Sequence, residues 1–472
     1  MEVNTTQTKE AYKIKNEIDS FLKNEILPGL EKLLLKHDNP NVVLRIDKLD
    51  VDLLAPGWEN RDQWKAEIIN QFEKQLLRQL QTGTQVSINK NQLSSIQVSG
   101  TENSEDIFLF FLESGYLPWF GNEDQIVDFV QHVVNEELQM SPSFVRRLAE
   151  VLSQKNESVE RLLNQFSAEL VVSFLAQLNQ DLKNKKLDIL LVLKNNHRMF
   201  NLEWLKILLK VSVEQSVDTI ISSVNKWFNF LQKPVSGFIK KEKKETSEIF
   251  KLFLVAVSGK VISEPKFQGI LNQSLAIVAM EKAVPETSEK VFIQKQKKDE
   301  PFLGENLNEI AVSNAGIILL HPFFKTFFRL LNVTDARGEI KPDKQNLAVQ
   351  LLYFLATGQE DVFEATLVFE KFLCGIPLKM PVLRKSLLTP KMRNETDNLL
   401  KQLIKNWEAL KNTSPDGVRQ MFLQRDGKLI QNEKNFKLIM ERKAQDVLLD
   451  KLNWNLSLVK IPWINNLLTV EW

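Results

Sequence analysis

Only a few side chains in this sequence are of the types that most often bind metals or act as nucleophiles. They are His37, His132, His197, His321 and Cys374. No two of the histidines lie at the short spacing that brings two metal ligands onto one helix or loop. We therefore expect no metal site, and the single cysteine excludes a disulfide within the chain. Cys374 follows an apolar stretch and precedes Gly375, a setting typical of a buried thiol rather than a nucleophile.

Motifs that bind phosphate groups or activate a nucleophile are missing from the sequence. Gly259-Lys260 lacks the upstream glycine of a phosphate-binding loop, and the pattern G-x-G-x-x-G occurs nowhere. No serine is surrounded by the strand-to-helix pattern of a nucleophile elbow. Acidic residues are common, so a hydrolase with an unfamiliar pair of carboxylates stays open as an alternative, although nothing marks two of them. We expect no cofactor and no enzymatic activity.

The remaining chemical signal is aromatic. His321-Pro322 interrupts an apolar run, which predicts a histidine ring packed at a helix kink with one ring nitrogen bonded to the backbone. Four phenylalanines follow, at Phe323, Phe324, Phe327 and Phe328. On a helix the first and third share one face, and the second and fourth share the next. An apolar surface this wide must be wholly buried or must contact a partner.

The elements that position these residues are best defined at 407–428. A helix with apolar residues at steps of three and four reaches Trp407 and ends before Thr413. Ser414 is expected to cap the next helix, because its hydroxyl can accept a hydrogen bond from a free backbone N–H, and Pro415 suits the first helical position. Asp426-Gly427 then predicts a turn into a strand, where glycine is demanded if φ is positive.

The same run, W-x-x-L-K-N-T-S-P-D-G-V-R-x-x-F-L-x-R-D-G-K-L, resembles the tape measure protein family of contractile injection systems, the phage-tail-like particles of bacteria. Further pieces resemble the family in order, at 314–323, 348–358, 371–375, 446–450, 461–463 and 470–472, with weaker pieces at 45–53 and 115–120. The resemblance marks the following positions as structural or partner-contact residues: Asn314, Gly316, His321, Pro322, Phe323, Gly358, Cys374, Gly375, Trp407, Thr413, Ser414, Pro415, Gly417, Arg419, Arg425, Gly427, Pro462, Trp463 and Trp472. None of these motifs is catalytic.

The resemblance implies a non-enzymatic assembly protein that sets the length of the inner tube. Such a protein would lie in or near the tube lumen and contact tube, baseplate or spike proteins. It would be cytoplasmic during assembly and then lie inside or on the particle. The alternative is a helical scaffold or loading chaperone of the same particle that binds tube subunits or cargo. In the first case Trp463, Trp472 and the Phe-rich surface are expected to anchor the chain to a partner.

Composition limits the other classes of partner. Lys and Arg number 61 against 60 Asp and Glu, which gives a net charge of +1 and no general attraction to nucleic acid. The mixed run at 240–245 is typical of a solvated helix end. The apolar runs are shorter than the ~18 residues that a membrane span needs, so we expect no membrane insertion. The first six residues carry neither the basic nor the apolar part of a secretory signal.

The order of patterns predicts a mainly α protein built from several modules of antiparallel helices. We expect an N-terminal α+β module at 1–80, a polar linker at 81–104, a helical region at 105–283, a charged linker at 284–304 and a C-terminal module at 305–472 whose helices precede a small antiparallel sheet. The first module should hold a helix at 9–36 kinked at Pro28-Gly29, a strand at 42–53 with a bulge near 47–48, and a helix through Trp64 and Leu76.

The two larger modules contain the remaining elements. Helices of the middle region are expected at 105–114, 123–138, 143–153, 157–165, 167–178, 201–213, 215–232, 246–258 and 267–280. Helices of the C-terminal module are expected at 313–331, 346–357, 362–374, 395–411 and 415–424. Strands should follow at 428–431, 436–441, 456–461 and 467–471, with a short helix at 446–452 between them.

Overall fold

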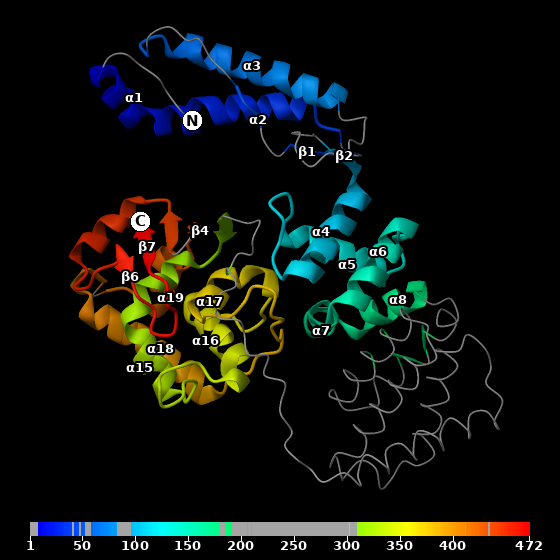
Figure 1. The fold of residues 1–472 in the computed structure, drawn as a ribbon. Helices are drawn as coiled ribbons and strands as arrows, with labels where there is room; N and C mark the ends of the chain where they lie inside the picture. Colours follow the sequence, from blue (N-terminus) through cyan, green and yellow to red (C-terminus); the bar gives the residue numbers. More distant parts are fainter. Residues whose placement is uncertain are drawn as a thin grey trace, which may run out of the picture. The chain divides into compact units, whose positions relative to one another are not determined.

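The computed structural model describes residues 8–39, 42–46, 49–51, 58–82, 96–178, 309–410, 412–432 and 435–472, together with a few single positions between 186 and 302. The chain divides into two compact units, Met1–Asp106 and Ile107–Trp472. Helices dominate, as predicted, with a small sheet near each end of the chain (Figure 1). The expected helices at 201–213, 215–232, 246–258 and 267–280, the bulge near 47–48, the charged run at 240–245 and almost all of the linker at 284–304 lie outside the described residues.

The first unit is built on two long helical stretches that pack side by side (Figure 1). Helix α1 (Thr8–Phe21) continues through a π-helical turn, η1 (Leu22–Ile26), into α2 (Leu27–Lys36), which packs against α3 (Arg61–Thr82). The irregularity predicted at Pro28 lies in that π-helical turn instead. Proline has no N–H to donate to the carbonyl four residues earlier. The wider turn accommodates this loss, because the N–H of Leu27 donates to the carbonyl of Leu22, five residues earlier. The core of this unit centres on Trp58, whose ring lies 5.3 Å from the rings of both Phe21 and Trp64.

A two-stranded antiparallel sheet joins β1 (Val42–Arg45) to β2 (Ile96–Ser99). Helix α4 (Gly100–Ser114) begins directly after β2, five residues earlier than the predicted start at 105, because the hydroxyl of Ser99 accepts a hydrogen bond from the N–H of Glu102 at 3.1 Å. The polar stretch at 81–104 therefore contains a strand and the first turn of a helix. Arg45 ties the strand to the helix through Asp106 at 2.9 Å.

The helical part of the second unit comprises the C-terminal half of α4, α5 (Glu123–Val134), α6 (Pro142–Gln154), α7 (Asn156–Gln165) and α8 (Ala168–Leu178). Ser141 caps α6 with a hydrogen bond of 3.1 Å from the N–H of Phe144, as its Ser-Pro pattern predicts. Helix α5 stops at Val134, before the predicted 138, because Glu136 takes a left-handed conformation with φ of 61°. Phe108 lies at the centre of this part, within 6.3 Å, centroid to centroid, of four other phenylalanine rings.

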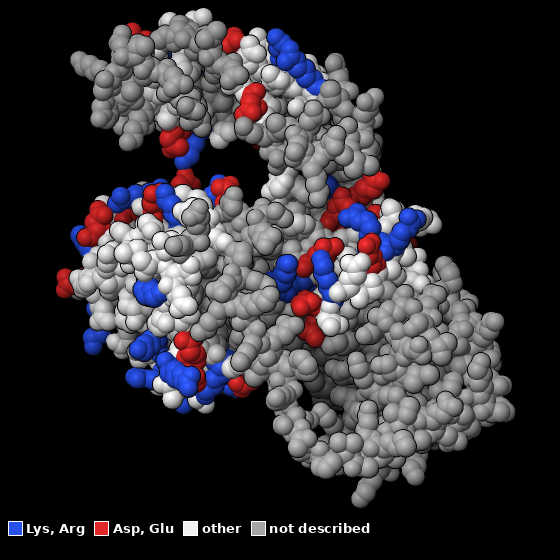
Figure 2. All heavy atoms as spheres, viewed as in Figure 1, with Lys and Arg blue, Asp and Glu red and all other residues white. Residues whose placement is uncertain are grey.

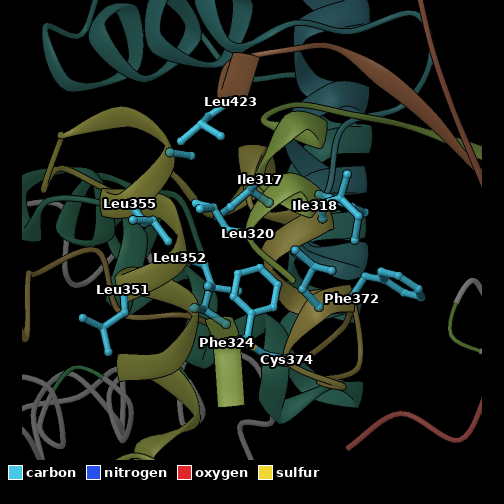
Figure 3. Packing of buried hydrophobic residues seen from close by; sticks show 14 of the residues in the cluster. Ile317, Ile318, Leu320, Phe324, Leu351, Leu352, Leu355, Phe372, Cys374 and Leu423 are labelled. Carbon is cyan, nitrogen blue, oxygen red and sulfur yellow. The ribbon is translucent and has the colours of Figure 1, made fainter. Parts of the chain in front are cut away.

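The C-terminal part packs short helices around α16 (Gln345–Thr357), whose side chains are almost all buried. The surrounding elements are the 3₁₀ helix η2 (Ala315–Leu320), α15 (His321–Leu330), the 3₁₀ turns η3 (Pro342–Lys344) and η4 (Glu364–Thr366), α17 (Val368–Leu373), α18 (Pro390–Asn406), the 3₁₀ turn η5 (Glu408–Leu410), α19 (Pro415–Val418) and the π-helical turn η6 (Arg419–Leu423). Figure 3 shows Leu352 of α16 beside Leu320 of η2 and Phe324 of α15. Predicted helices at 313–331, 362–374, 395–411 and 415–424 are each present but broken into α, 3₁₀ or π pieces.

The C-terminal sheet has five strands in the order β3-β4-β5-β7-β6. Its strands are β3 (Glu309–Val312), β4 (Gly427–Gln431), β5 (Phe436–Met440), β6 (Leu458–Val459) and β7 (Leu468–Glu471). The prediction of a wholly antiparallel sheet is wrong at one pair, because β5 and β7 run parallel. The chain between them passes through the 3₁₀ helix η7 (Ala444–Lys451) and β6, which is long enough for the crossover that a parallel pair requires. Strand β3 was not predicted, and β6 has two residues instead of the expected six.

Candidate functional site in the C-terminal region

The most informative motif folds around a buried tryptophan and a capped turn. Trp407 ends α18 with its indole N–H bonded to the carbonyl of Leu448 at 3.1 Å. Ser414 caps α19, as predicted, through a hydrogen bond of 3.1 Å from the N–H of Gly417. Pro415 occupies the first turn, and the methyl group of Thr413 would be 2.9 Å from a Cβ at Gly417. This part of the motif is therefore explained by capping and by tight packing.

Arg419 lies just after this cap and joins three elements. Its guanidinium pairs with Asp416 at 2.7 Å and with Asp397 of α18 at 2.9 Å, and its Nε donates to the carbonyl of Leu355 at 3.3 Å. That carbonyl belongs to the last turn of α16, where a cation is favoured by the helix dipole. Gly358 ends α16 in a left-handed conformation with φ of 72° and lies against the Arg419 side chain.

Close backbone packing explains the glycines of the motifs. Asn314 takes a left-handed conformation, and a Cβ at Gly316 would overlap the carbonyl oxygen of Phe422. Gly427 does not need a positive φ, because the described glycines with positive φ are at other positions. It is required for space instead, since a Cβ there would lie 2.9 Å from the Cβ of Ala315 and 3.1 Å from the carbonyl oxygen of Ile439. Two segments more than a hundred residues apart thus meet backbone to backbone.

A buried ion pair anchors the last residue. Arg425 binds Asp446 with two hydrogen bonds, of 3.0 and 2.8 Å, in the paired geometry that favours arginine over lysine. The indole N–H of Trp472 donates to the same carboxylate at 3.0 Å, and its ring lies 5.7 Å from the Arg425 guanidinium. Trp472 is half-buried.

The aromatic motif residues also find partners within the chain. His321 lies at the junction of η2 and α15 with Nδ1 3.0 Å from the carbonyl oxygen of Ile318, as predicted, and burial lowers the pKa of its imidazole. Trp463 stacks on Phe328 at 5.3 Å and donates to the carbonyl of Leu373 at 2.7 Å, beside Gly375, whose φ is 65°. Phe323 contacts the ring of Trp454, and Pro462 is exposed. The Phe-rich surface is thus mostly buried inside the fold.

Glu370 is a buried carboxylate that forms no ion pair with any residue that the structure describes. Its Oε1 accepts a hydrogen bond of 2.9 Å from Asn314, and its Oε2 has no hydrogen-bond partner among these residues. Burial raises its pKa to about 7, because removal from water disfavours the charged form more than the hydrogen bonds from Asn314 and from its own backbone stabilise it. Cys374 lies nearby, buried as predicted, and burial raises the pKa of its thiol. A thiol of this kind is unreactive.

A second buried group of charges was not predicted from the sequence. Arg161 of α7 and Lys371 of α17 both contact the Oε1 atom of Glu364, at 3.0 and 2.7 Å, and all three side chains are at most 1% exposed. Gly115 makes room for them, since its φ is 81° and a Cβ there would lie 2.7 Å from Glu364 and 2.8 Å from Arg161. A usable signal was the spacing of the polar residues Ser158, Arg161 and Gln165, which places all three on one face of the predicted helix at 157–165.

Within the described residues there is no group of three or more His, Cys, Asp or Glu side chains that could hold a metal ion. In the same residues no helix has the length and apolarity to cross a bilayer. The protein is mainly helical. The positions that the resemblance marked cap helices, allow two backbone segments to approach closely, or form buried ion pairs.

The description of the family whose sequence model matches the chain is contractile injection system tape measure protein, and the match covers residues 1–472. The chain therefore belongs to this family of structural, non-enzymatic particle components. No curated protein and no solved structure matches it.

Proposed function

We propose that the protein sets the length of the inner tube while a contractile injection particle assembles. The observation that carries the proposal is the family match over the whole chain. A protein that sets a length needs no active site. It needs an extended state whose reach depends on its number of residues, and one region that holds a fixed component of the particle.

The reach of the chain is compatible with this role only in an extended state. One continuous helix of 472 residues would span roughly 700 Å at 1.5 Å per residue, and an extended chain would reach roughly 1,600 Å. A compact chain of this length has a radius of gyration of only ~23 Å. The compact protein must therefore be remodelled as it enters the tube, or several copies must act together.

We expect the C-terminal region, 305–472, to hold a baseplate or spike protein, and the rest of the chain to lie along tube proteins. Apolar side chains remain exposed beside the motif residues, notably Leu330 at 57% and Leu458 at 53%. Figure 2 shows Lys and Arg interspersed with Asp and Glu on the visible face of this region, a distribution that does not favour nucleic acid. We expect the protein to fold in the cytoplasm before it joins the particle.

The alternative, a scaffold or loading chaperone, is favoured by the compact fold, in which 107–178 and 309–472 belong to one unit. A chaperone would act in this compact form and would change how many particles are made rather than how long they are.

Removal of the predicted helices at 215–232 and 246–258, which leaves Leu205 and Leu209 of the helical core in place, separates the two functions. The proposal expects normal numbers of shorter particles by electron microscopy, and particles of uncontrolled length when the whole gene is deleted. Fewer particles of normal length would support the chaperone and contradict the length-setting role.

A further inference from the structure

The chain leaves the second unit and returns to it. Helix α8 ends at Leu178 inside the helical part, and β3 begins at Glu309 inside the C-terminal sheet. Both ends of the segment 179–308 are therefore fixed to one folded unit. While this unit is intact, the distance between the two ends does not change with the number of residues between them. A chain that measures by its own length must first separate 107–178 from 309–472.

The contact between these parts is a junction formed by α7 on one side and η4, α17 and residues 378–384 on the other. Arg161 contacts Glu364 at 3.0 Å and donates to the carbonyl of Lys379 at 2.6 Å. Gln165 donates to the carbonyl of Val382 at 2.7 Å, and its amide oxygen accepts from the N–H of Glu364 at 2.9 Å. The junction is hydrogen-bonded and ionic.

Each part has an apolar core of its own beside this junction. Most buried residues of the helical core lie at 107–175. The others are Ile189, Leu205 and Leu209 of the segment 179–308, and Phe363 and Ala365 of the C-terminal side. The buried residues of the C-terminal core all lie at 312–470, and Tyr116 is the one described side chain from the helical part that packs against it. Separation at the junction therefore withdraws Phe363, which lies against Phe111 at 5.0 Å, and Ala365 from the helical core, and it withdraws Tyr116 from the C-terminal core. The remaining buried residues of each core stay packed.

The buried charges of the junction make its closed state easy to separate. Two cations, Arg161 and Lys371, share the one carboxylate of Glu364, so among the described residues one of the two buried positive charges has no anion of its own. Burial lowers the pKa of Lys371 to about 8, with the positive charge of Arg161 acting in the same direction. Opening returns all three groups to water, and a buried ionic network is often no more stable than an apolar replacement of the same shape.

We propose that this junction is a releasable latch, closed in the free protein and opened when the chain is laid out in the tube. This inference rests on the proposed length-setting function. The latch holds 107–178 and 309–472 together, and with them the two ends of the segment 179–308, until contact with other particle proteins separates the two parts. On opening, water hydrates the side chains of Arg161, Glu364 and Lys371, so none of their charges is left buried without a partner. The two folded parts therefore survive the transition.

The test places fluorescent dyes on each side of the junction in the full chain. Glu157→Cys on α7 and Lys391→Cys on α18 are exposed positions, while the native Cys374 is buried. The unmodified chain, which should take up no dye, is the labelling control. We expect high energy transfer in the free protein and loss of most of that transfer in purified particles. Transfer that stays high in particles would overturn the latch.

A locked variant tests the same idea without dyes. Arg161→Met/Glu364→Leu/Lys371→Leu replaces the ionic network with apolar groups that cannot be hydrated on opening, and Arg442→Met/Asp450→Leu removes an exposed pair as a matched control. The locked variant should melt no lower than the control and should fail to give particles of defined length. Normal lengths with the locked variant would overturn the latch. A wild-type chain that opens in particles, yet whose length does not set tube length, would refute the proposed function and leave the latch intact.

Discussion

Replacement of Glu370 by glutamine tests how the C-terminal core is held together. The carboxyl group accepts a hydrogen bond from the side chain of Asn314, and its pKa rises from 4.5 to about 7. One pKa unit corresponds to about 1.4 kcal/mol, so the shift amounts to about 3 kcal/mol. Because the folded state binds the proton more tightly, this contribution is fully present below pH 4.5, declines as the pH rises through about 7 and is absent above it.

Glu370→Gln resembles the protonated acid in shape and carries no charge. The free energy of unfolding of the wild type should therefore fall by about 3 kcal/mol relative to that of the variant between pH 4 and pH 8. Thiol labelling of Cys374 in increasing urea measures this locally, because that cysteine is buried in the same core. Glu339→Gln, at an exposed position, is the control and should not alter the pH dependence. Parallel pH profiles for wild type and Glu370→Gln would refute the assignment of a buried, unpaired carboxylate.

Three further predictions address the folded state. Ser414→Ala removes the cap of α19 and should lower the free energy of unfolding by about 1 kcal/mol in urea titrations, and an unchanged midpoint would show that the cap is not needed. Gly316→Ala should disrupt the packing of the C-terminal region, so that calorimetry no longer shows a cooperative unfolding transition for it. Gly100→Ala is the control, because a Cβ there has no atom within 4 Å, and its calorimetric trace should be unchanged. Proteolysis should cut first within 81–104 and 284–304. The fragment 305–472 should fold but melt below the full chain, because it lacks the junction, and equal melting temperatures would contradict this.

The sequence was most informative where a structure depends on neighbours in the chain. Ser414 and Ser141 were predicted as caps because the acceptor and the donor lie three residues apart. The steps of four from Trp64 to Leu76 predicted α3, since one helix face decides burial. The ring of His321 was placed correctly for the same reason, because its carbonyl partner is three residues away.

The features that could not be predicted join distant parts of the chain. The four residues of β3 carry too little pattern to be recognised, and β3 exists because β4, more than a hundred residues later, pairs with it. The parallel pairing of β5 and β7 depends on how the intervening chain crosses the sheet. Arg161 and Glu364 are 203 positions apart, so the sequence around either residue does not indicate which residue pairs with it. The sequence predicted Gly427 in a turn, whereas glycine is required there because a larger side chain would collide with Ala315.

The central claim, that the number of residues in this chain sets tube length, is tested most directly by the slope of particle length against block size. In-frame duplications of 215–232, 215–258 and 215–280 lengthen the segment between α8 and β3 and repeat none of the described residues. Length distributions from electron microscopy should shift by roughly 15 to 33 Å for each ten residues added, the limits set by helical and extended chain. A tube length that stays constant across all three duplications would contradict the account.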